Sequence, residues 1–392
     1  MKLRLATILA VTLVGGVINA QDFKARAIAL HKQTPLIDGH NDYPWALRDI
    51  DPGRDLSKAD IAEPVPKLMT DIPRLRQGGV GGQFWSVYTP STMMGKEATR
   101  VTMEQIDTVH RMTERWPTVF QIARTADDID RAFKAGRIAS LIGMEGGHSI
   151  DNSLAALRMF HVLGARYMTL THSSNLAWAD SATDKPVHGG LTKFGEEVVH
   201  EMNRLGMLVD LSHVSPDTME DALRVTEAPV IFSHSSARAI CNVPRNVPDN
   251  ILQIVAKNGG VVMVTFVPGF ISQAVADFNA RPEAERKGMT APRATLSQVA
   301  DHIDHIRKVA GIDHIGLGGD FDGITEVVQG LEDVSKYPDL TAELLKRGYS
   351  DADVKKIIGQ NVMRVLRQVE KVAASLQKSR QPSTATIEQL DK

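Results

Sequence analysis

The feature that most constrains the fold of this chain is a repeated alternation of short apolar segments with longer segments of helical spacing. Eight apolar segments occur, at residues 36–42, 78–88, 138–147, 167–172, 207–213, 229–234, 260–266 and 314–322. Continuous apolar strands separated by helices are typical of a parallel sheet that is buried on both faces. Eight such units predict the α/β class and a (β/α)8 barrel of the TIM type, with an open doubly wound sheet as the alternative.

Ionisable side chains stand where six of the eight predicted strands end. They are His40 and Asp42 on the first strand, Glu145 on the third, His172 on the fourth, His213 on the fifth, His234 on the sixth and Asp320 on the eighth. A barrel brings the carboxyl ends of all its strands to one face, which an open sheet does less readily. One histidine at a strand end is usually an ordinary surface residue, but four of them with three carboxylates on one face favour a metal site.

The number of candidate ligands favours two metal ions over one. A single catalytic zinc takes three protein ligands and a water, whereas two ions about 3.5–4 Å apart need a bridging carboxylate and share a hydroxide. In strand order, Glu145 lies between the His40 and Asp42 pair and the His213 and His234 pair, so it is the predicted bridge. His172 and Asp320 are then left for acid–base and oxyanion chemistry.

Composition excludes several other classes of function. The 392 residues carry a net charge of −2, which provides no electrostatic basis for binding nucleic acid or an anionic membrane surface, so neither is expected as a partner. The single cysteine, Cys241, excludes a disulfide within the chain and is expected to be a small buried residue.

The two ends of the chain differ from its body. Lys2 and Arg4 precede an apolar run and then Ala20, a pattern typical of a cleavable signal peptide over residues 1–20. A membrane anchor is the alternative, but the run is short for a span of about 20 residues. We therefore expect a secreted or periplasmic protein without a stable membrane anchor, with a catalytic domain at 21–370. Residues 371–392 are expected to form a flexible polar tail.

Ordered motifs around the strand ends resemble those of the membrane (renal-type) dipeptidase family, which are zinc peptidases among the metal-dependent amidohydrolase barrels. The motifs are DGHND at 38–42, GGHS at 146–149, THSSN at 171–175, DLSH at 210–213, FSHSS at 232–236 and GGDFDG at 318–323. Segments 245–249 and 330–335 fit as well, and the resemblance extends from residue 37 to about residue 369. This chain lacks the C-terminal lipid signal and the disulfides of mammalian members, so it resembles a soluble exported bacterial form.

The resemblance implies a site with two zinc ions. His40 and Asp42 would hold one ion, His213 and His234 the other, and Glu145 would bridge them. The implied reaction is hydrolysis of the peptide bond of a dipeptide by a hydroxide shared between the ions. Dipeptides with a C-terminal D-residue and β-lactams are candidate side substrates, and a homodimer is a candidate assembly.

The resemblance also implies roles for residues beyond the metal ligands. His172 would hydrogen-bond the substrate carbonyl oxygen and the oxyanion, and Asp320 would move a proton from the attacking water to the leaving amine. Arg245 would pair with the free carboxylate of the dipeptide, since a guanidinium fork suits a carboxylate. An aromatic side chain at Phe270 is expected to line the pocket, and His148 is expected to support the site without binding metal.

Two other functions compete with dipeptide hydrolysis. A barrel hydrolase of another small amide, lactone or N-acyl amino acid would not need Arg245 as a carboxylate anchor. A periplasmic solute- or metal-binding protein would bind metal without turnover, and it would not need Asp320.

Overall fold

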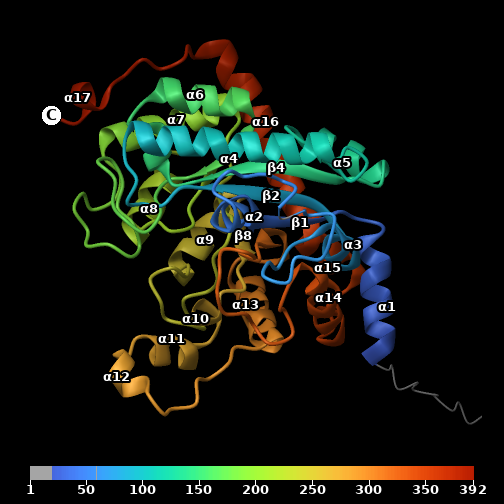
Figure 1. Cartoon of the computed structure of the whole chain (residues 1–392). Helices are drawn as coiled ribbons and strands as arrows, with labels where there is room; N and C mark the ends of the chain where they lie inside the picture. Colours follow the sequence, from blue (N-terminus) through green and yellow to red (C-terminus); the bar gives the residue numbers. More distant parts are fainter. Residues whose placement is uncertain (1–19, 59) are drawn as a thin grey trace, which may run out of the picture.

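The centre of the molecule is a closed parallel barrel of eight strands (Figure 1). The computed structural model describes residues 20–58 and 60–392. The barrel strands are β1 (Leu36–Asn41), β2 (Val80–Tyr88), β4 (Ile138–Glu145), β5 (Ala165–Thr169), β6 (Leu208–Asp210), β7 (Ile231–Phe232), β8 (Val261–Val264) and β9 (Ile315–Leu317). Each strand pairs in parallel with its neighbours, β1 with β9 and β2 with β4, which closes the ring and confirms the predicted (β/α)8 barrel.

A ninth strand, β3 (Phe120–Ile122), pairs only with β4. It lies along the first residues of β4, from Ile138, whereas β5 takes over the pairing at Ile142. The sequence analysis missed this strand because three residues are too few to show a pattern. Its place at the amino-terminal end of β4 keeps it away from the barrel mouth.

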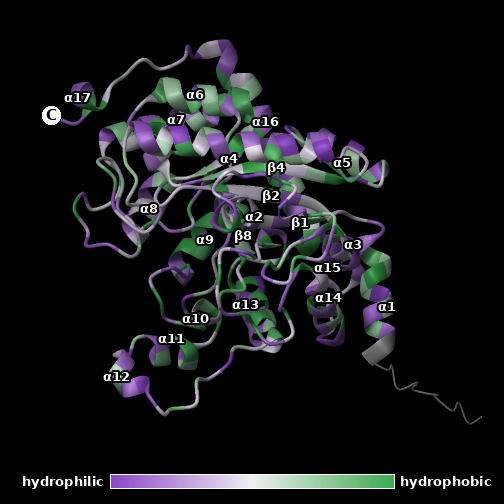
Figure 2. Ribbon diagram, viewed as in Figure 1, coloured by the Kyte–Doolittle hydropathy of each residue, from purple (hydrophilic) through white to green (hydrophobic). Residues whose placement is uncertain are grey.

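Helices surround the barrel, and their polar sides face outward while the strands are apolar (Figure 2). The longer helices are α1 (Ala20–His31), α2 (Tyr43–Ile50), α4 (Lys96–Arg115), α5 (Ala126–Lys134), α6 (Leu154–Leu163), α7 (Lys193–Leu205), α8 (Pro216–Val225), α9 (Asp249–Asn258), α13 (Leu296–Val309), α14 (Tyr337–Lys346) and α16 (Asn361–Ser379). The shorter ones are α3 (Ile72–Gly78), α10 (Pro268–Ile271), α11 (Gln273–Asn279), α12 (Glu283–Arg286), α15 (Asp351–Lys355) and α17 (Ile387–Leu390). None of the described helices is long and apolar enough to cross a bilayer.

Local sequence explains where several helices begin. The Thr125 hydroxyl accepts a hydrogen bond from the Asp128 amide, and the Asp128 carboxylate accepts one from the Thr125 amide, so this pair forms a capping box for α5. The Ser215 hydroxyl caps α8 by accepting a hydrogen bond from the Thr218 amide, with Pro216 at the first helical position. These caps fix the first turns of α5 and α8.

The predictions for the two ends of the chain have different outcomes. The predicted signal peptide lies almost wholly outside the described residues, which begin with α1. At the other end, the predicted tail from residue 371 starts inside α16, because the helix keeps an apolar side through the buried Ala373. Beyond α16 the chain runs back to α7, where the Asp391 carboxylate accepts hydrogen bonds from Thr192 and from the Phe194 amide (Figure 1).

Candidate metal centre and active site

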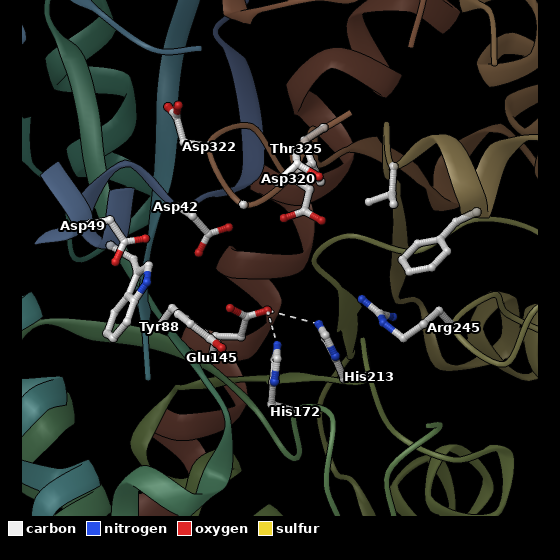
Figure 3. A pocket seen from close by; sticks show the side chains of 15 residues that line it. Asp42, Asp49, Tyr88, Glu145, His172, His213, Arg245, Asp320, Asp322 and Thr325 are labelled. Carbon is white, nitrogen blue, oxygen red and sulfur yellow. Dashed lines mark ion pairs between the residues drawn. The ribbon is translucent and has the colours of Figure 1, made fainter. Parts of the chain in front are cut away.

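A pocket of about 460 Å³ opens at the carboxyl ends of the barrel strands (Figure 3). We call it the mouth pocket. Seven of the residues singled out by the sequence line it: Asp42, Glu145, His172, His213, Arg245, Phe270 and Asp320. The remaining two candidates, His40 and His234, are buried and contact the same cluster from below. The barrel therefore brings together side chains that are up to 280 residues apart in the sequence.

Four histidine nitrogens surround one carboxylate oxygen at the floor of the pocket. Oε1 of Glu145 lies 3.1 Å from Nε2 of His213, 3.5 Å from Nε2 of both His40 and His234, and 3.7 Å from Nε2 of His172. Each histidine comes from the end of a different strand, so Glu145 on β4 is the common neighbour that the sequence analysis required of a bridge.

Two carboxylates complete the cluster on the side of β1 and β9. Oδ2 of Asp42 lies 3.3 Å from Nε2 of His40, and Oδ1 of Asp320 lies 4.0 Å from the same nitrogen. Asp320 and His213 both have positive φ angles, 62° and 69°. A non-glycine residue in the left-handed region costs of order 1–3 kcal/mol and is held there by its surroundings. At both positions this turn directly follows a strand and leaves the side chain lining the mouth pocket.

Some buried nitrogen and oxygen atoms of the cluster have no hydrogen-bond partner, and they show whether the cluster suits a metal ion. Among the described residues, His40 Nε2, Asp42 Oδ1 and His213 Nδ1 are buried without a hydrogen-bond partner. Three overlapping sets have ligand atoms within 4.8 Å of one another: His40, Glu145 and His234; Glu145, His172 and His213; and His40, Asp42 and Asp320. Buried polar atoms that lack a partner are costly, and nitrogen and carboxylate oxygen donors suit zinc. The residues therefore fit a metal centre.

The pKa values of His213, His234 and Glu145 favour the protonation states that bind cations. Burial lowers the pKa of His213 and of His234 well below the usual range, so both are neutral imidazoles with a free lone pair. Burial opposes ionisation of Glu145, but the neighbouring histidines, His40 first among them, outweigh it and hold its pKa well below the usual range. Burial would lower the pKa of His40 too, but Tyr167, Glu145 and Asp42 outweigh it and hold this pKa well above its usual range, so a metal ion would have to displace a proton from the ring. Burial raises the pKa of Asp320 well above its usual range, which suits a group that carries a proton.

A second layer of hydrogen bonds orients the histidines, and the sequence analysis missed it. Nδ1 of His40 lies 2.8 Å from the Tyr167 hydroxyl, which also lies 3.3 Å from the carbonyl oxygen of Gly39. Nδ1 of His234 lies 2.8 Å from the Ser233 hydroxyl, which in turn donates to the buried carboxylate of Asp210 at 2.6 Å. In both cases the partner engages Nδ1 and leaves Nε2 facing Glu145. Asp210 and Ser233 belong to the DLSH and FSHSS motifs, but Tyr167 has no sequence signal beyond its place in a strand.

Arg245 is a buried cation without a buried anion. The residue is 4% exposed. Its guanidinium reaches only Ser235 Oγ at 3.4 Å and the His234 carbonyl oxygen at 3.5 Å, and it lies 5.2 Å from the centroid of the Phe270 ring. No carboxylate of the described residues lies within ion-pair distance of it. Burying an unpaired charge is costly, so this side chain is prepared for an anionic ligand that enters the mouth pocket.

His148 does not join the metal cluster. Its Nε2 lies 3.0 Å from the Thr89 carbonyl oxygen, and burial lowers its pKa to about 4. It forms part of a short 3-10 turn, Gly147–Ile150, directly after β4. This position agrees with the expected supporting role.

A (β/α)8 barrel that carries histidines and carboxylates around one buried glutamate at its mouth defines a metal-dependent hydrolase. The chain belongs to the membrane dipeptidase family (Peptidase family M19), whose model matches residues 24–380. It is therefore a metallo-dipeptidase, as the resemblance of its motifs predicted.

Similar proteins agree with this assignment. The dipeptidase verJ of Clonostachys rogersoniana is 43% identical over 369 residues, which cover 91% of this chain and 90% of that protein. A metallo peptidase from Rhodobacter sphaeroides, solved with a phosphinate mimic of the dipeptide L-Ala-D-Ala, is 26% identical with a TM-score of 0.75, over 86% of this chain and 99% of that one. The probable dipeptidase PvdM from Pseudomonas aeruginosa shares the fold, with a TM-score of 0.80 at 24% identity over 90% of this chain and 100% of that one.

Proposed function

We propose that this chain is a two-zinc dipeptidase that hydrolyses the peptide bond of dipeptides, including those with a C-terminal D-residue. His40 and Asp42 would hold one ion, His213 and His234 the other, and Glu145 would bridge them. The observation that carries this proposal is the position of Glu145 Oε1, within 3.5 Å of histidine nitrogens from both pairs. The phosphinate mimic of L-Ala-D-Ala bound by the Rhodobacter sphaeroides relative supports the inclusion of D-residues.

His172 would stabilise the substrate carbonyl oxygen as negative charge develops on it. When bound, a pair of zinc ions makes water a nucleophile at neutral pH and polarises the carbonyl. Burial lowers the pKa of His172, which favours the neutral ring. Its Nδ1 lies 3.0 Å from the Ser173 hydroxyl, which can donate to that nitrogen. The remaining ring proton then sits on Nε2, on the side that faces Glu145 and the pocket, and can be donated to an oxyanion.

Asp320 would carry the proton from the attacking water to the leaving amine. Its carboxylate lines the mouth pocket, and its raised pKa gives it the protonated form that a general acid needs. It lies across the pocket from His172, so the two groups would act on opposite sides of the scissile bond (Figure 3).

Arg245 would bind the free carboxylate of the dipeptide and so restrict the substrate to short peptides. The test compares Ala-Ala with its C-terminal amide, in the wild type, Arg245→Lys and Arg245→Ala. The wild type should prefer the free acid, and Arg245→Ala should lose about 10–100-fold in kcat/KM on Ala-Ala, mostly through KM, because a charge-assisted hydrogen bond is worth about 1.5–3 kcal/mol.

Other outcomes of this comparison would reject parts of the proposal. Equal cleavage of the amide by the wild type would favour a hydrolase of other small amides. No cleavage of any dipeptide by the zinc-loaded protein would reject the proposed function.

We also propose that residues 1–20 direct export and are removed. The basic start and the apolar run support this reading. Protein recovered from the exported fraction should begin at Gln21, and recovery of the intact amino terminus from the cytoplasm would contradict it.

A further inference from the structure

The mouth pocket contains one carboxylate for which the proposed function has no use. Its lining includes the carboxylates of Asp42, Asp49, Glu145, Asp320 and Asp322. Three of these belong to the metal centre and the proton transfer. Asp322 is half-buried and accepts a hydrogen bond of 2.6 Å from the Met69 amide, so one role of its carboxylate is to hold the segment at Met69. Asp49 differs from all four because it is exposed at the rim.

Asp49 has no cationic partner among the described residues. The nearest cation in sequence, Arg48, pairs with Glu104 at 2.9 Å, and Glu104 also holds Arg54 at 2.7 Å. Arg245 is the only lysine or arginine that lines the mouth pocket, and it stands on the opposite side with Glu145 and His172 between (Figure 3). The negative charge of Asp49 is therefore available to a ligand.

Aromatic rings adjoin Asp49 on the same side of the pocket. Trp45 lies one turn earlier on α2, and its ring packs edge-on against Tyr88 with 5.1 Å between the centroids. Both rings line the pocket. A carboxylate beside aromatic rings attracts organic cations, and the Arg48 guanidinium already lies 5.6 Å from the centroid of the Trp45 ring.

The direction in which a dipeptide binds decides which of its two residues contacts Asp49, Trp45 and Tyr88. If the dipeptide carboxylate pairs with Arg245 and the scissile carbonyl lies at Glu145 and His172, the N-terminal residue extends toward Asp49. We infer that Asp49, with Trp45 and Tyr88, forms a subsite for a basic N-terminal side chain, so that dipeptides beginning with lysine or arginine are preferred. This inference rests on the proposed function and names a substrate class for the same site.

The experiment compares Lys-Ala with norleucyl-Ala, whose first side chain has the same four carbons without the ammonium group. The readout is the ratio of their kcat/KM values in the zinc-loaded full chain. We expect the wild type to prefer Lys-Ala, Asp49→Asn to reduce the ratio about twofold to tenfold, and Asp49→Lys to reverse it. The control is Asp127→Asn, which removes an exposed carboxylate from α5, outside the pocket lining, and should keep the wild-type ratio.

The outcomes separate this inference from the proposed function. If Ala-Ala is cleaved but the ratio is the same in the wild type and both Asp49 variants, the subsite is wrong and the dipeptidase function stands. If the kcat/KM values of both substrates fall by the same factor in Asp49→Asn, the carboxylate acts on a group common to all dipeptides, such as the α-amino group. The inference is then overturned as well. If no dipeptide is cleaved, both the subsite and the proposed dipeptidase function are wrong.

Discussion

Replacement of Tyr167 by phenylalanine should weaken zinc binding without unfolding the protein. The Tyr167 hydroxyl is fully buried inside the barrel, 2.8 Å from His40 Nδ1 and 3.3 Å from the Gly39 carbonyl oxygen. Burial raises the pKa of the phenol, so it keeps its proton and can donate it to Gly39. The hydroxyl oxygen then accepts the proton of His40 Nδ1, so that Nε2, which faces Glu145, is the nitrogen that would give its lone pair to a bound zinc ion.

The expected magnitude follows from that single hydrogen bond. In Tyr167→Phe, the buried Nδ1–H of His40 would lose its acceptor, which costs about 1–3 kcal/mol. The ring can avoid this cost by moving its proton to Nε2, but that tautomer cannot bind a metal through the nitrogen that faces Glu145. Zinc must then displace the proton, and we expect its affinity to fall about 10–100-fold, the usual effect of losing such a supporting partner.

The assay is a zinc competition titration against a chromophoric chelator, followed by activity at excess zinc. The control variant is Tyr349→Phe, which removes a hydroxyl that donates to Asp304 at 2.6 Å, far from the metal centre. Both variants should lose some stability, but only Tyr167→Phe should lose zinc affinity and recover activity as zinc is added. An unchanged zinc affinity in Tyr167→Phe would refute the proposed orientation of His40.

Two further predictions address the proton carrier and the stability of the barrel. Asp320→Asn should lower kcat about 10²–10⁴-fold while keeping the wild-type zinc content; unchanged kcat, or loss of zinc, would contradict a role in proton transfer. His31 is buried against the Gly78 carbonyl oxygen and the Thr341 hydroxyl, and burial lowers its pKa to about 4. The unfolded chain therefore binds a proton on His31 at a higher pH than the native state does. The free energy of unfolding should fall by about 3 kcal/mol more in the wild type than in His31→Gln as the pH drops from about 6.5 to about 4. Chemical denaturation at several pH values measures this difference, and parallel pH profiles for the two proteins would contradict it.

Most of the barrel could be predicted because its strands are short, apolar and separated by helices. Burial on both faces makes β8 wholly apolar and β4 mostly apolar up to its final Glu145, so these strands are easily recognised in the sequence. β3 could not be found in this way, because a strand of three residues has no period. The length of α16 was underestimated because polar residues dominate its last turns, although Ala373 is still buried beside Gly206 at the end of α7.

The polar groups of the site were predictable where they end strands, and less so where they support other residues. His172 and Glu145 could be found from position alone, since the barrel closes their strand ends around one pocket. Tyr167 looks like an ordinary core aromatic, and its contact with His40 depends on the distance across the barrel from β5 to β1. Asp49 looks like a solvent-exposed helix residue until the helix is placed at the rim of the pocket.

The zinc content of the wild type and of Glu145→Gln tests the central claim most directly. The claim is that Glu145 joins the His40 and Asp42 pair to the His213 and His234 pair in a single site. Elemental analysis of the zinc-saturated and dialysed protein should find two zinc ions per wild-type chain and a loss from both positions in Glu145→Gln. One zinc per wild-type chain, or two that persist in Glu145→Gln, would contradict the bridging role and with it the proposed two-metal site.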